Sequence, residues 1–439
     1  MAISPIPHWF EGSEYTHKVA ACIMKYGPIS RITLAQILGL SQGAVSRITS
    51  DLIYAGVIEE TPMAAGHGGK LPKDFLRKSA QKSIQKENTE RRGRPQTGLR
   101  IIANARTFVG MKINTTHITA VTVNALGQIV TGCHDLPLDD DSPESVVDVI
   151  RQLTMDCADE AIMAGLPSPC AVGVSLGGHI TDDSVTTFAP FLHWSKPVEF
   201  SAMIRKATGL PTGIYNDIDS LVVDACMFGS GVGLNSFAVV TIGIGVGYSL
   251  TVNGEPIDNP DKSYGLVGHI LVDPDGPRCI SGHKGCATCL TDNSIATEYS
   301  EMIGHPATFD EFAAAARASK TQATNLVNRT CFRLGTLIAT IANLAMPDKI
   351  MIAGESSFIA KLGIDNLRNG INMYRHSQAA PVDFEIAEHD WSLWSKAAAA
   401  QSHSPVCRVS RSESLSQCEA GTRKYQPHHT KQILRCGLL

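Results

Sequence analysis

Three segments near the amino end of the chain carry apolar residues at helical spacing. A serine that can cap a helix precedes the second and the third segment, and glycines separate the segments. A helix, a short turn and a capped helix are typical of a helix-turn-helix, and the VIEET stretch that follows predicts a strand, as in a winged helix. The predicted helices span Tyr15–Tyr26, Ile32–Leu38 and Gln42–Ala55.

From Phe108 onward the pattern changes to short apolar strands that alternate with helices. Residues 108–130 predict three strands joined by tight turns, and residues 142–165 predict a helix. Strands and helices alternate up to a strand pair in residues 237–255, and a long apolar helix with a buried strand follows in residues 328–355. This order suits a two-lobed α/β fold with a cleft.

Composition and charge add to this pattern. The chain has 439 residues, of which 43% are hydrophobic and 18% charged, as is typical of a globular protein with two or three domains. The formal net charge is −4, yet residues 1–100 hold 14 Lys and Arg against 8 Asp and Glu. A basic end on an acidic body indicates nucleic-acid binding at that end.

The amino-terminal residues lack the basic and apolar regions of a secretory signal, and the longest apolar stretches are too short to span a bilayer. Twelve cysteines without an export signal favour reduced thiols or a metal site over a disulfide framework. We therefore expect a cytoplasmic protein with no membrane partner.

The predicted third helix has a polar face that suits double-stranded DNA. Side chains on this face can reach base edges and phosphates in a major groove. A helical hairpin with a solvated polar face would show the same pattern. The candidate DNA-binding residues of this helix are Gln42, Ser46, Arg47 and Thr49.

A basic segment follows the predicted winged helix. Residues 61–100 hold ten Lys and Arg against three Asp and Glu and include the run RRGRP. Arg91, Arg92 and Arg94 of this run form a narrow, extended segment that can enter a minor groove. A solvated linker is the alternative, and residues 62–90 fit either an enlarged wing or a flexible linker. Beside a helix-turn-helix, the pattern favours DNA binding.

The sequence resembles the ROK family of repressors, open reading frames and sugar kinases from Tyr15 to Ala400. The most specific match is GHILVDPDGPRCISGHKGC, residues 268–286, where the family has Gly-His, nine residues and Cys-x-Cys-Gly-x-x-Gly-Cys. The resemblance implies an α/β body that is actin-like (ribonuclease H-like) and two-lobed, as in sugar kinases, with an amino-terminal winged helix-turn-helix in the regulators.

On this basis we expect four regions. A winged helix-turn-helix covers residues 15–62, and a basic wing or linker covers residues 63–106. The effector-binding body covers residues 107–400, with lobes of about 107–225 and 226–400. Residues 401–439 have no apolar periodicity and no family counterpart, so we expect a disordered tail. The abrupt change in composition there also motivates the hypothesis of a displaced reading frame.

The family motif predicts a structural zinc site. His269, Cys279 and Cys286 offer one imidazole and two thiolates within eighteen residues, and a structural zinc ion takes four such ligands. Ser281 stands where the family has its second cysteine. The fourth position is therefore open between Ser281, His283 and Cys289, and a reduced loop with buried thiols is the alternative.

The resemblance also implies a sugar site, at Asn216, Asp217 and His269. In the family's kinases the aspartate of the Asn-Asp pair accepts the proton of the attacking sugar hydroxyl, although a helix cap would explain the pair equally. Leu266 and Thr288 stand where the family has glutamates that hold the sugar. The usual hexose would bind weakly, or the ligand differs.

The phosphate loops argue against a kinase. The register of the family's Asp-x-Gly-Gly-Thr reads KINTT from Lys112, so that a cation replaces the magnesium carboxylate. Ile244 replaces the threonine of the second loop. We expect a DNA-binding repressor of carbohydrate-metabolism genes that has no catalytic residues, senses a sugar or sugar phosphate, and binds a double-stranded operator as a homodimer or homotetramer. The alternatives are an ATP-dependent sugar kinase and a regulator that has lost its effector.

Overall fold

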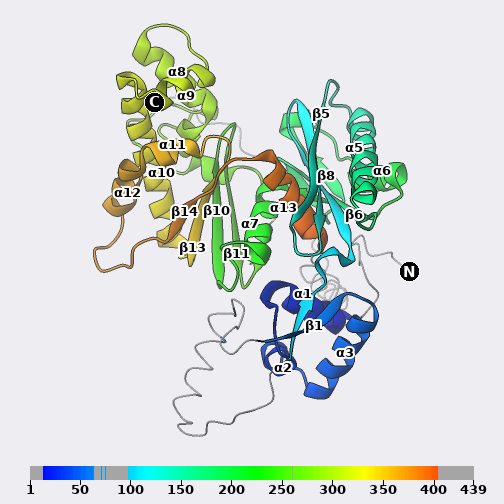
Figure 1. The fold of residues 1–439 in the computed structure, drawn as a ribbon. Coiled ribbons are helices and arrows are strands. Elements are labelled where there is room, and N and C mark those ends of the chain that lie inside the picture. The colour runs from blue at the N-terminus through cyan, green and yellow to red at the C-terminus, as the bar shows by residue number, and fades with distance from the viewer. Residues whose placement is uncertain (1–12, 64–70, 72–74, 76–96, 260, 404–439) are drawn as a thin grey trace, which may run out of the picture.

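The computed structural model describes residues 13–63, 71, 75, 97–259 and 261–403 (Figure 1). These residues form an amino-terminal head, residues 13–62 with 97–101, and a body of two lobes that are each built around a five-stranded sheet. The head lies at one end of the body (Figure 1). The α/β architecture expected from the sequence is confirmed.

Three helices and a two-stranded antiparallel sheet make up the head. Each helix begins after a serine, Ser13, Ser30 or Ser41, whose hydroxyl accepts a hydrogen bond from a first-turn backbone N–H. The predicted helices and the strand after them are confirmed to within a few residues. The elements are α1 Glu14–Tyr26, α2 Arg31–Leu38, α3 Gln42–Tyr54, β1 Ile58–Pro62 and β2 Thr97–Ile101.

Strand β2 lies inside the range 63–106 that the sequence assigned to a basic wing or linker. It pairs with β1 along its whole length, from Ile58 opposite Ile101 to Pro62 opposite Thr97. Residues 63–96 therefore join two paired strands of the head. Most of that connection, including the RRGRP run, lies outside the described residues.

The sheet of the first lobe has the strand order β5-β4-β3-β6-β9. Strands β3, β6 and β9 run parallel, so their carboxyl ends meet at one edge, where ligands bind in open α/β sheets. The elements are η1 Ala103–Ala105, β3 Thr107–Ile113, β4 His117–Asn124, β5 Ile129–Pro137, α5 Pro143–Met163, β6 Pro169–Leu176, β7 His179–Thr181, β8 Val185–Phe188, η2 Pro190–Leu192, α6 Phe200–Thr208 and β9 Thr212–Asn216.

The sheet of the second lobe has the order β12-β11-β10-β13-β14, and the buried face of α10 packs against it. Apolar side chains of β10 and β13 form this core with α10, as the long apolar helix and buried strand predicted. The elements are β10 Ser236–Ile242, β11 Val246–Val252, β12 Glu255–Pro256, η3 Leu266–His269, η4 Ala287–Leu290, α8 Asp292–Ile303, α9 Phe309–Arg317, α10 Thr321–Leu344, β13 Lys349–Ala353, α11 Phe358–Leu362, α12 Ile364–Met373 and β14 Phe384–Ile386.

Two helices, α7 (Asp217–Phe228) and α13 (Trp391–His403), lie between the two sheets (Figure 1). Helix α13 packs against β3, β4 and β6, so the carboxyl end of the body returns to the first lobe, whereas the sequence placed it in the second. The close approach of α13 to β3 requires a glycine at position 110, because a Cβ at Gly110 would lie 2.0 Å from the carbonyl oxygen of Ser395.

The head shares its apolar core with the body. One cluster of buried residues contains Val19 and Leu52 of the head, Phe108 and Val121 of the first lobe, and Ala399 of α13. Only residues 102–106 separate β2 of the head from β3 of the body. Head and first lobe are therefore joined by packing as well as by the chain. No helix within the described ranges is both long and apolar enough to cross a bilayer.

Candidate functional site

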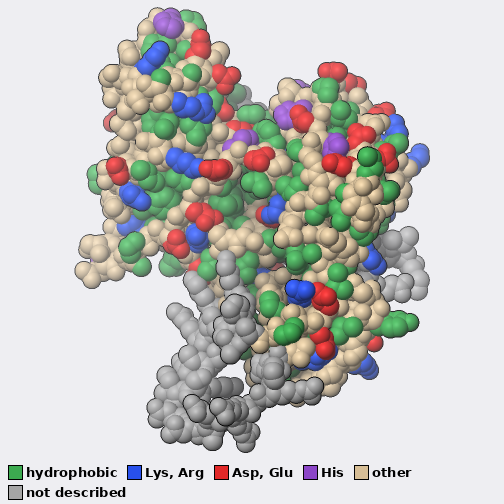
Figure 2. Space-filling view, viewed as in Figure 1, with side chains coloured by type: hydrophobic (Ala, Val, Ile, Leu, Met, Phe, Trp, Pro, Cys, Tyr) green, Lys and Arg blue, Asp and Glu red, His purple; other side chains and the backbone are tan. Residues whose placement is uncertain are grey.

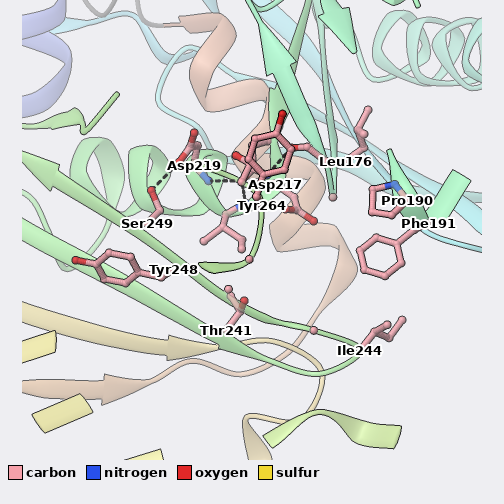
Figure 3. Close-up of a pocket in the computed structure, with 18 of the residues that line it drawn as sticks. Leu176, Pro190, Phe191, Asp217, Asp219, Thr241, Ile244, Tyr248, Ser249 and Tyr264 are labelled. Carbon is pink, nitrogen blue, oxygen red and sulfur yellow. Dashed lines mark hydrogen bonds between the residues drawn. The ribbon is translucent and has the colours of Figure 1, made fainter. Parts of the chain in front are cut away.

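A cavity of about 800 Å³ opens between the lobes (Figure 3). The first lobe contributes the β3–β4 turn, the ends of β6 and β9, Phe188 and residues 190–192. The second lobe contributes the β10–β11 hairpin, Ile257, Asn259 and residues 261–267. Trp391 and Trp394 of α13 complete the wall. The volume falls within the range typical of small-molecule sites.

Asn216 and Asp217, the residues of the expected sugar site, both line this cavity. Asn216 ends β9 and caps α7, since its side chain accepts hydrogen bonds from the N–H groups of Ile218 and Asp219 and donates one to the Gly178 carbonyl. Its amide group is thus used in holding the strand–helix junction. The carboxylate of Asp217 is the group of this pair that can accept ligand hydroxyls.

Lys112, at the end of β3, forms an ion pair with Asp217. Its Nζ lies 2.6 Å from Asp217 Oδ2, and the two side chains are 7% and 13% exposed. The ammonium group also lies 5.6 Å from the ring centroid of Trp394. Lys112, which stands where the family's kinases have a magnesium-binding aspartate, therefore lies directly beside Asp217.

Two more carboxyl groups lie near this pair. Glu355 lines the cavity, and burial raises its pKa; its own backbone N–H and Lys112 oppose the shift, and nearby Asp292 and Asp217 add to it. Burial also raises the pKa of Asp292, which accepts a hydrogen bond from Ser356. These carboxyl groups retain a proton to higher pH than exposed ones do.

Asp219, in the first turn of α7, ties the second lobe to the cavity. It accepts a hydrogen bond from Ser249 at 2.6 Å (Figure 3). It accepts another from Lys262 at 3.1 Å, and Lys262 also lies 3.4 Å from Asp258. Burial lowers the pKa of Lys262, but Asp219 and Asp258 outweigh it and raise the pKa overall. The loop that carries Lys262 is thus held over the cavity by charge.

Tyr264, from the same loop, reaches across to the first lobe. Its ring stacks on His179, with centroids 4.9 Å apart and planes 9° from parallel, and its centroid lies 6.1 Å from that of Phe188. The two lobes therefore touch above the cavity through aromatic side chains. Sequence reasoning missed Tyr264, Lys262 and Trp391 because no local motif marks them.

His269 does not line the cavity. It lies instead in a cluster with Cys279, His283 and Cys286, whose potential ligand atoms are all within 4.8 Å of one another. The two histidine Nδ1 atoms are 3.2 Å apart, and Cys279 Sγ lies 3.9 Å from His269 Nδ1. Of the candidates for the fourth position, the structure brings His283 into the cluster, and Cys289 is not part of it.

The donor set of this cluster fits a zinc ion. Two sulfur and two nitrogen ligands on a tetrahedral zinc lie about 3.3–3.8 Å from one another, close to the two separations measured here. Burial raises the pKa of the Cys279 thiol, but hydrogen bonds from Cys286 and from the N–H groups of Ser281 and His283 outweigh it and lower the pKa overall. The thiolate form, which binds metal, is thereby favoured.

The exposed face of α3 is the candidate nucleic-acid interface. Gln42, Ser46 and Arg47 are exposed, as predicted. Thr49 is not: its side chain is fully buried, accepts a hydrogen bond from Arg31 Nε at 2.9 Å and donates one to the Ser46 carbonyl. The candidates Arg91, Arg92 and Arg94 lie outside the described residues.

On the face of the body that Figure 2 shows, charged side chains of both signs are mixed. Arg31 itself is engaged, because it also pairs with Glu60 of β1 at 2.8 Å. It holds α2, α3 and β1 together.

Known proteins resemble this chain over most of its length. The DNA-binding transcriptional repressor Mlc of Escherichia coli K12 is 23% identical over 354 residues, which cover 77% of this chain and 80% of that protein. The xylose repressor of Bacillus subtilis strain 168 is 20% identical over 361 residues, which cover 81% and 86%.

Solved structures share the fold. A ROK family transcriptional regulator, a homologue of the E. coli Mlc protein, matches with a TM-score of 0.69 at 22% identity and covers 90% of this chain and 96% of that one. A ROK family glucokinase from Streptomyces griseus, in complex with glucose and AMPPNP, matches with a TM-score of 0.56 at 20% identity over 68% of this chain and 98% of that one. The ROK family profile itself matches residues 108–392, well over half of the sequence, and the chain therefore belongs to the ROK family.

Proposed function

We propose that this chain is a DNA-binding transcriptional regulator, a repressor of carbohydrate-metabolism genes, whose cleft senses a sugar or sugar phosphate. The observation that carries the proposal is the path of α7. This helix begins at the cavity with Asp217 and ends with Met227 and Phe228 packed against the core that the head shares with the body. A ligand that moves the start of α7 also moves the surface on which the head rests.

Helix α13 also connects the cavity with the apolar core that the head shares with the body. Trp391 and Trp394 line the cavity at its amino end, and Ala399 belongs to the shared core. A ligand changes DNA binding only if it binds the two states of the head with different affinity. Helices α7 and α13 each touch the cavity and the core shared with the head. They therefore supply contacts through which the ligand can bind the two states with different affinity.

We assign operator binding to the head. Gln42, Ser46 and Arg47 would enter the major groove of double-stranded DNA, and Arg91, Arg92 and Arg94 would enter the minor groove. The repressor Mlc and the xylose repressor are relatives whose names support this role. Half-sites of such heads call for a homodimer or homotetramer, and DNA binding calls for a cytoplasmic chain.

We assign the cleft to sensing and not to phosphoryl transfer. Magnesium neutralises the phosphates in a kinase, and an acidic side chain holds it. In this chain Lys112 stands at that position and its ammonium group is paired with Asp217. Lys112 cannot bind magnesium as the aspartate at its position would. Its ammonium group also engages the Asp217 carboxylate that would act as the base, so we assign no catalytic residue.

We propose zinc as the structural metal of the His269, Cys279, His283 and Cys286 cluster. Zinc, when bound, supplies a tetrahedral crosslink between the four side chains. His269 ends η3, whose residues Leu266 and Val267 line the cavity. The crosslink would therefore fix one wall of the effector site.

The test is binding of the purified full chain to its own upstream promoter DNA, with and without a panel of sugars and sugar phosphates. Specific binding that one compound releases supports the proposal. Specific binding that no compound alters supports a regulator without an effector. Absence of specific binding at moderate salt, together with ATP-dependent sugar phosphorylation, would replace the proposal by the kinase.

A further inference from the structure

Large apolar side chains are exposed in the cleft, on both of its walls. Six of them line the cavity and keep between 39% and 60% of their surface exposed. Apolar surface of this extent, gathered in one concave site, marks a place where an apolar group binds. The six are Phe188 and Phe191 of the first lobe and Ile244, Ile257, Tyr264 and Leu266 of the second.

Ile244 is the clearest of these. It stands at the tip of the hairpin between β10 and β11, where turn chemistry favours glycine and polar residues. Figure 3 shows its side chain on one side of the cleft, with Pro190 and Phe191 on the other. A group bound between them would cover both walls.

A hydroxyl acceptor lies directly beside this apolar space. A Cβ at Gly177 would lie 3.0 Å from Phe191 Cδ2 and 3.5 Å from Asp217 Oδ2, so the ring and the carboxylate flank the same glycine. Asp217 accepts one hydrogen bond from Lys112 and one from the Ile218 N–H, and a carboxylate has about four lone-pair sites, which leaves room for ligand hydroxyls.

The charges in the cavity argue for a neutral ligand. Its Asp and Glu side chains outnumber its two lysines among the described lining residues. Lys112 is paired with Asp217, and Lys262 is paired with Asp219 and Asp258. A phosphate or carboxylate on the ligand would meet carboxylates without a cation of its own, at a cost in desolvation.

We propose that the effector is a neutral aryl glycoside, with its sugar hydroxyls at Asp217 and its aromatic aglycone between Phe191 on one wall and Ile244 and Leu266 on the other. The inference rests on the proposed function and narrows its ligand class. Aromatic side chains on the walls suit an aromatic ring, which packs against them by edge and face. The cavity of about 800 Å³ holds a sugar ring and an aglycone together.

The experiment is isothermal titration of the full chain with matched probes: phenyl and 4-nitrophenyl glycosides, the corresponding free sugars, the corresponding sugar phosphates, and phenol. We expect at least one aryl glycoside to bind about 50-fold more tightly than its free sugar, because the ring buries roughly 100 Å² of apolar surface. Equal or tighter binding of the free sugar or its phosphate, or no binding of any probe, would overturn the inference.

Two variants locate the aglycone. Leu266→Gln and Ile244→Thr should each lower the preference for the aryl glycoside over the free sugar about 10-fold. Leu344→Gln is the matched control, because Leu344 is also exposed but lies at the end of α10, outside the cavity. Equal effects of Leu266→Gln and Leu344→Gln would contradict the placement.

The same proteins separate this inference from the proposed function. If the protein binds its operator but no aryl glycoside, the inference about the effector is wrong and the proposed function stands. Tight binding of an aryl glycoside without specific DNA binding would sink the proposed function alone. If Ile244→Thr changes operator binding with no ligand present and aryl glycosides do not bind, the apolar walls serve to close on each other, and the inference is wrong.

Discussion

Lys396 on α13 donates hydrogen bonds to both carboxylate oxygens of Asp224 on α7, with its Nζ 2.6 Å from each. Both side chains are largely buried, at 18% and 17% exposure. Burial raises the pKa of Asp224, and Lys396 opposes the shift. The pair locks together the two helices that run from the cavity to the head.

Breaking this pair should destabilise the protein strongly. Lys396→Met leaves the Asp224 carboxylate buried without its partner, so we expect the free energy of unfolding to fall by about 3–5 kcal/mol in urea titrations. The double variant Lys396→Met with Asp224→Leu should recover part of the loss. Lys361→Met is the control, because Lys361 pairs with Glu388 at the surface and its loss should cost less than about 1 kcal/mol. Equal effects of the two single variants would contradict a buried lock.

Arg47→Ala should weaken operator binding about 10- to 100-fold, since one direct base contact contributes about 1–3 kcal/mol. Fluorescence anisotropy with labelled operator measures it. Arg368→Ala is the matched control, because Arg368 is exposed on α12, in the second lobe. A loss of affinity shared by both variants would mean that Arg47 contributes only general charge.

Thr49→Val should act differently from Arg47→Ala. The substitution removes the acceptor of Arg31 inside the head, so we expect a loss of about 1–3 kcal/mol in stability. Operator affinity of the folded protein should stay within about threefold of the original. A loss of affinity as large as that of Arg47→Ala, in a protein of unchanged stability, would restore Thr49 to the DNA interface.

Metal analysis can test whether the cluster binds zinc and which residue is its fourth ligand. We expect one zinc ion per chain, and we expect Cys286→Ser and His283→Ala each to weaken zinc by at least about 100-fold in chelator competition, more than loss of an outer partner would. Ser281→Ala and Cys289→Ala should retain the metal. Zinc lost from Cys289→Ala but retained in His283→Ala would reverse the assignment of the fourth ligand.

Buried thiols should make the protein sensitive to alkali. Burial raises the pKa of Cys22, Cys157 and Cys331 to about 12 each, from 9.0. Between these values the folded state keeps protons that the unfolded state loses, so stability falls as pH rises above about 9, by at most about 1.4 kcal/mol per pH unit and thiol. Cys157→Ala should flatten this slope in urea titrations at pH 8 to 10, whereas Ser145→Ala on the same helix should not.

Local patterns in the sequence sufficed for most helices and strands. Ser30 and Ser41 could be identified as caps because a cap acts within one turn of its own helix. Thr49 was misjudged although the sequence held the signal. It follows Val45 by four residues and precedes Leu52 by three, so helical periodicity places all three on the buried face.

The cleft depended on contacts that no local pattern specifies. Lys112 and Asp217 are 105 residues apart and meet only because β3 and β9 end at the same edge of one sheet. Tyr264 and His179 come from different lobes. His283 was one of three open candidates, and the choice followed from the turn of the loop that brings it to His269.

The apolar core shared by the head and the first lobe has a consequence for folding. Val19 and Leu52 belong to the same cluster of buried residues as Phe108 and Val121, and only residues 102–106 intervene between the two units. Neither unit could unfold without exposing apolar surface of the other, so the two form one cooperative unit, with no separate melting step for the head. Amide protons of α1 and β3 should then exchange through a common opening, and a head cut free at residue 101 should be less stable than the same head in the full chain.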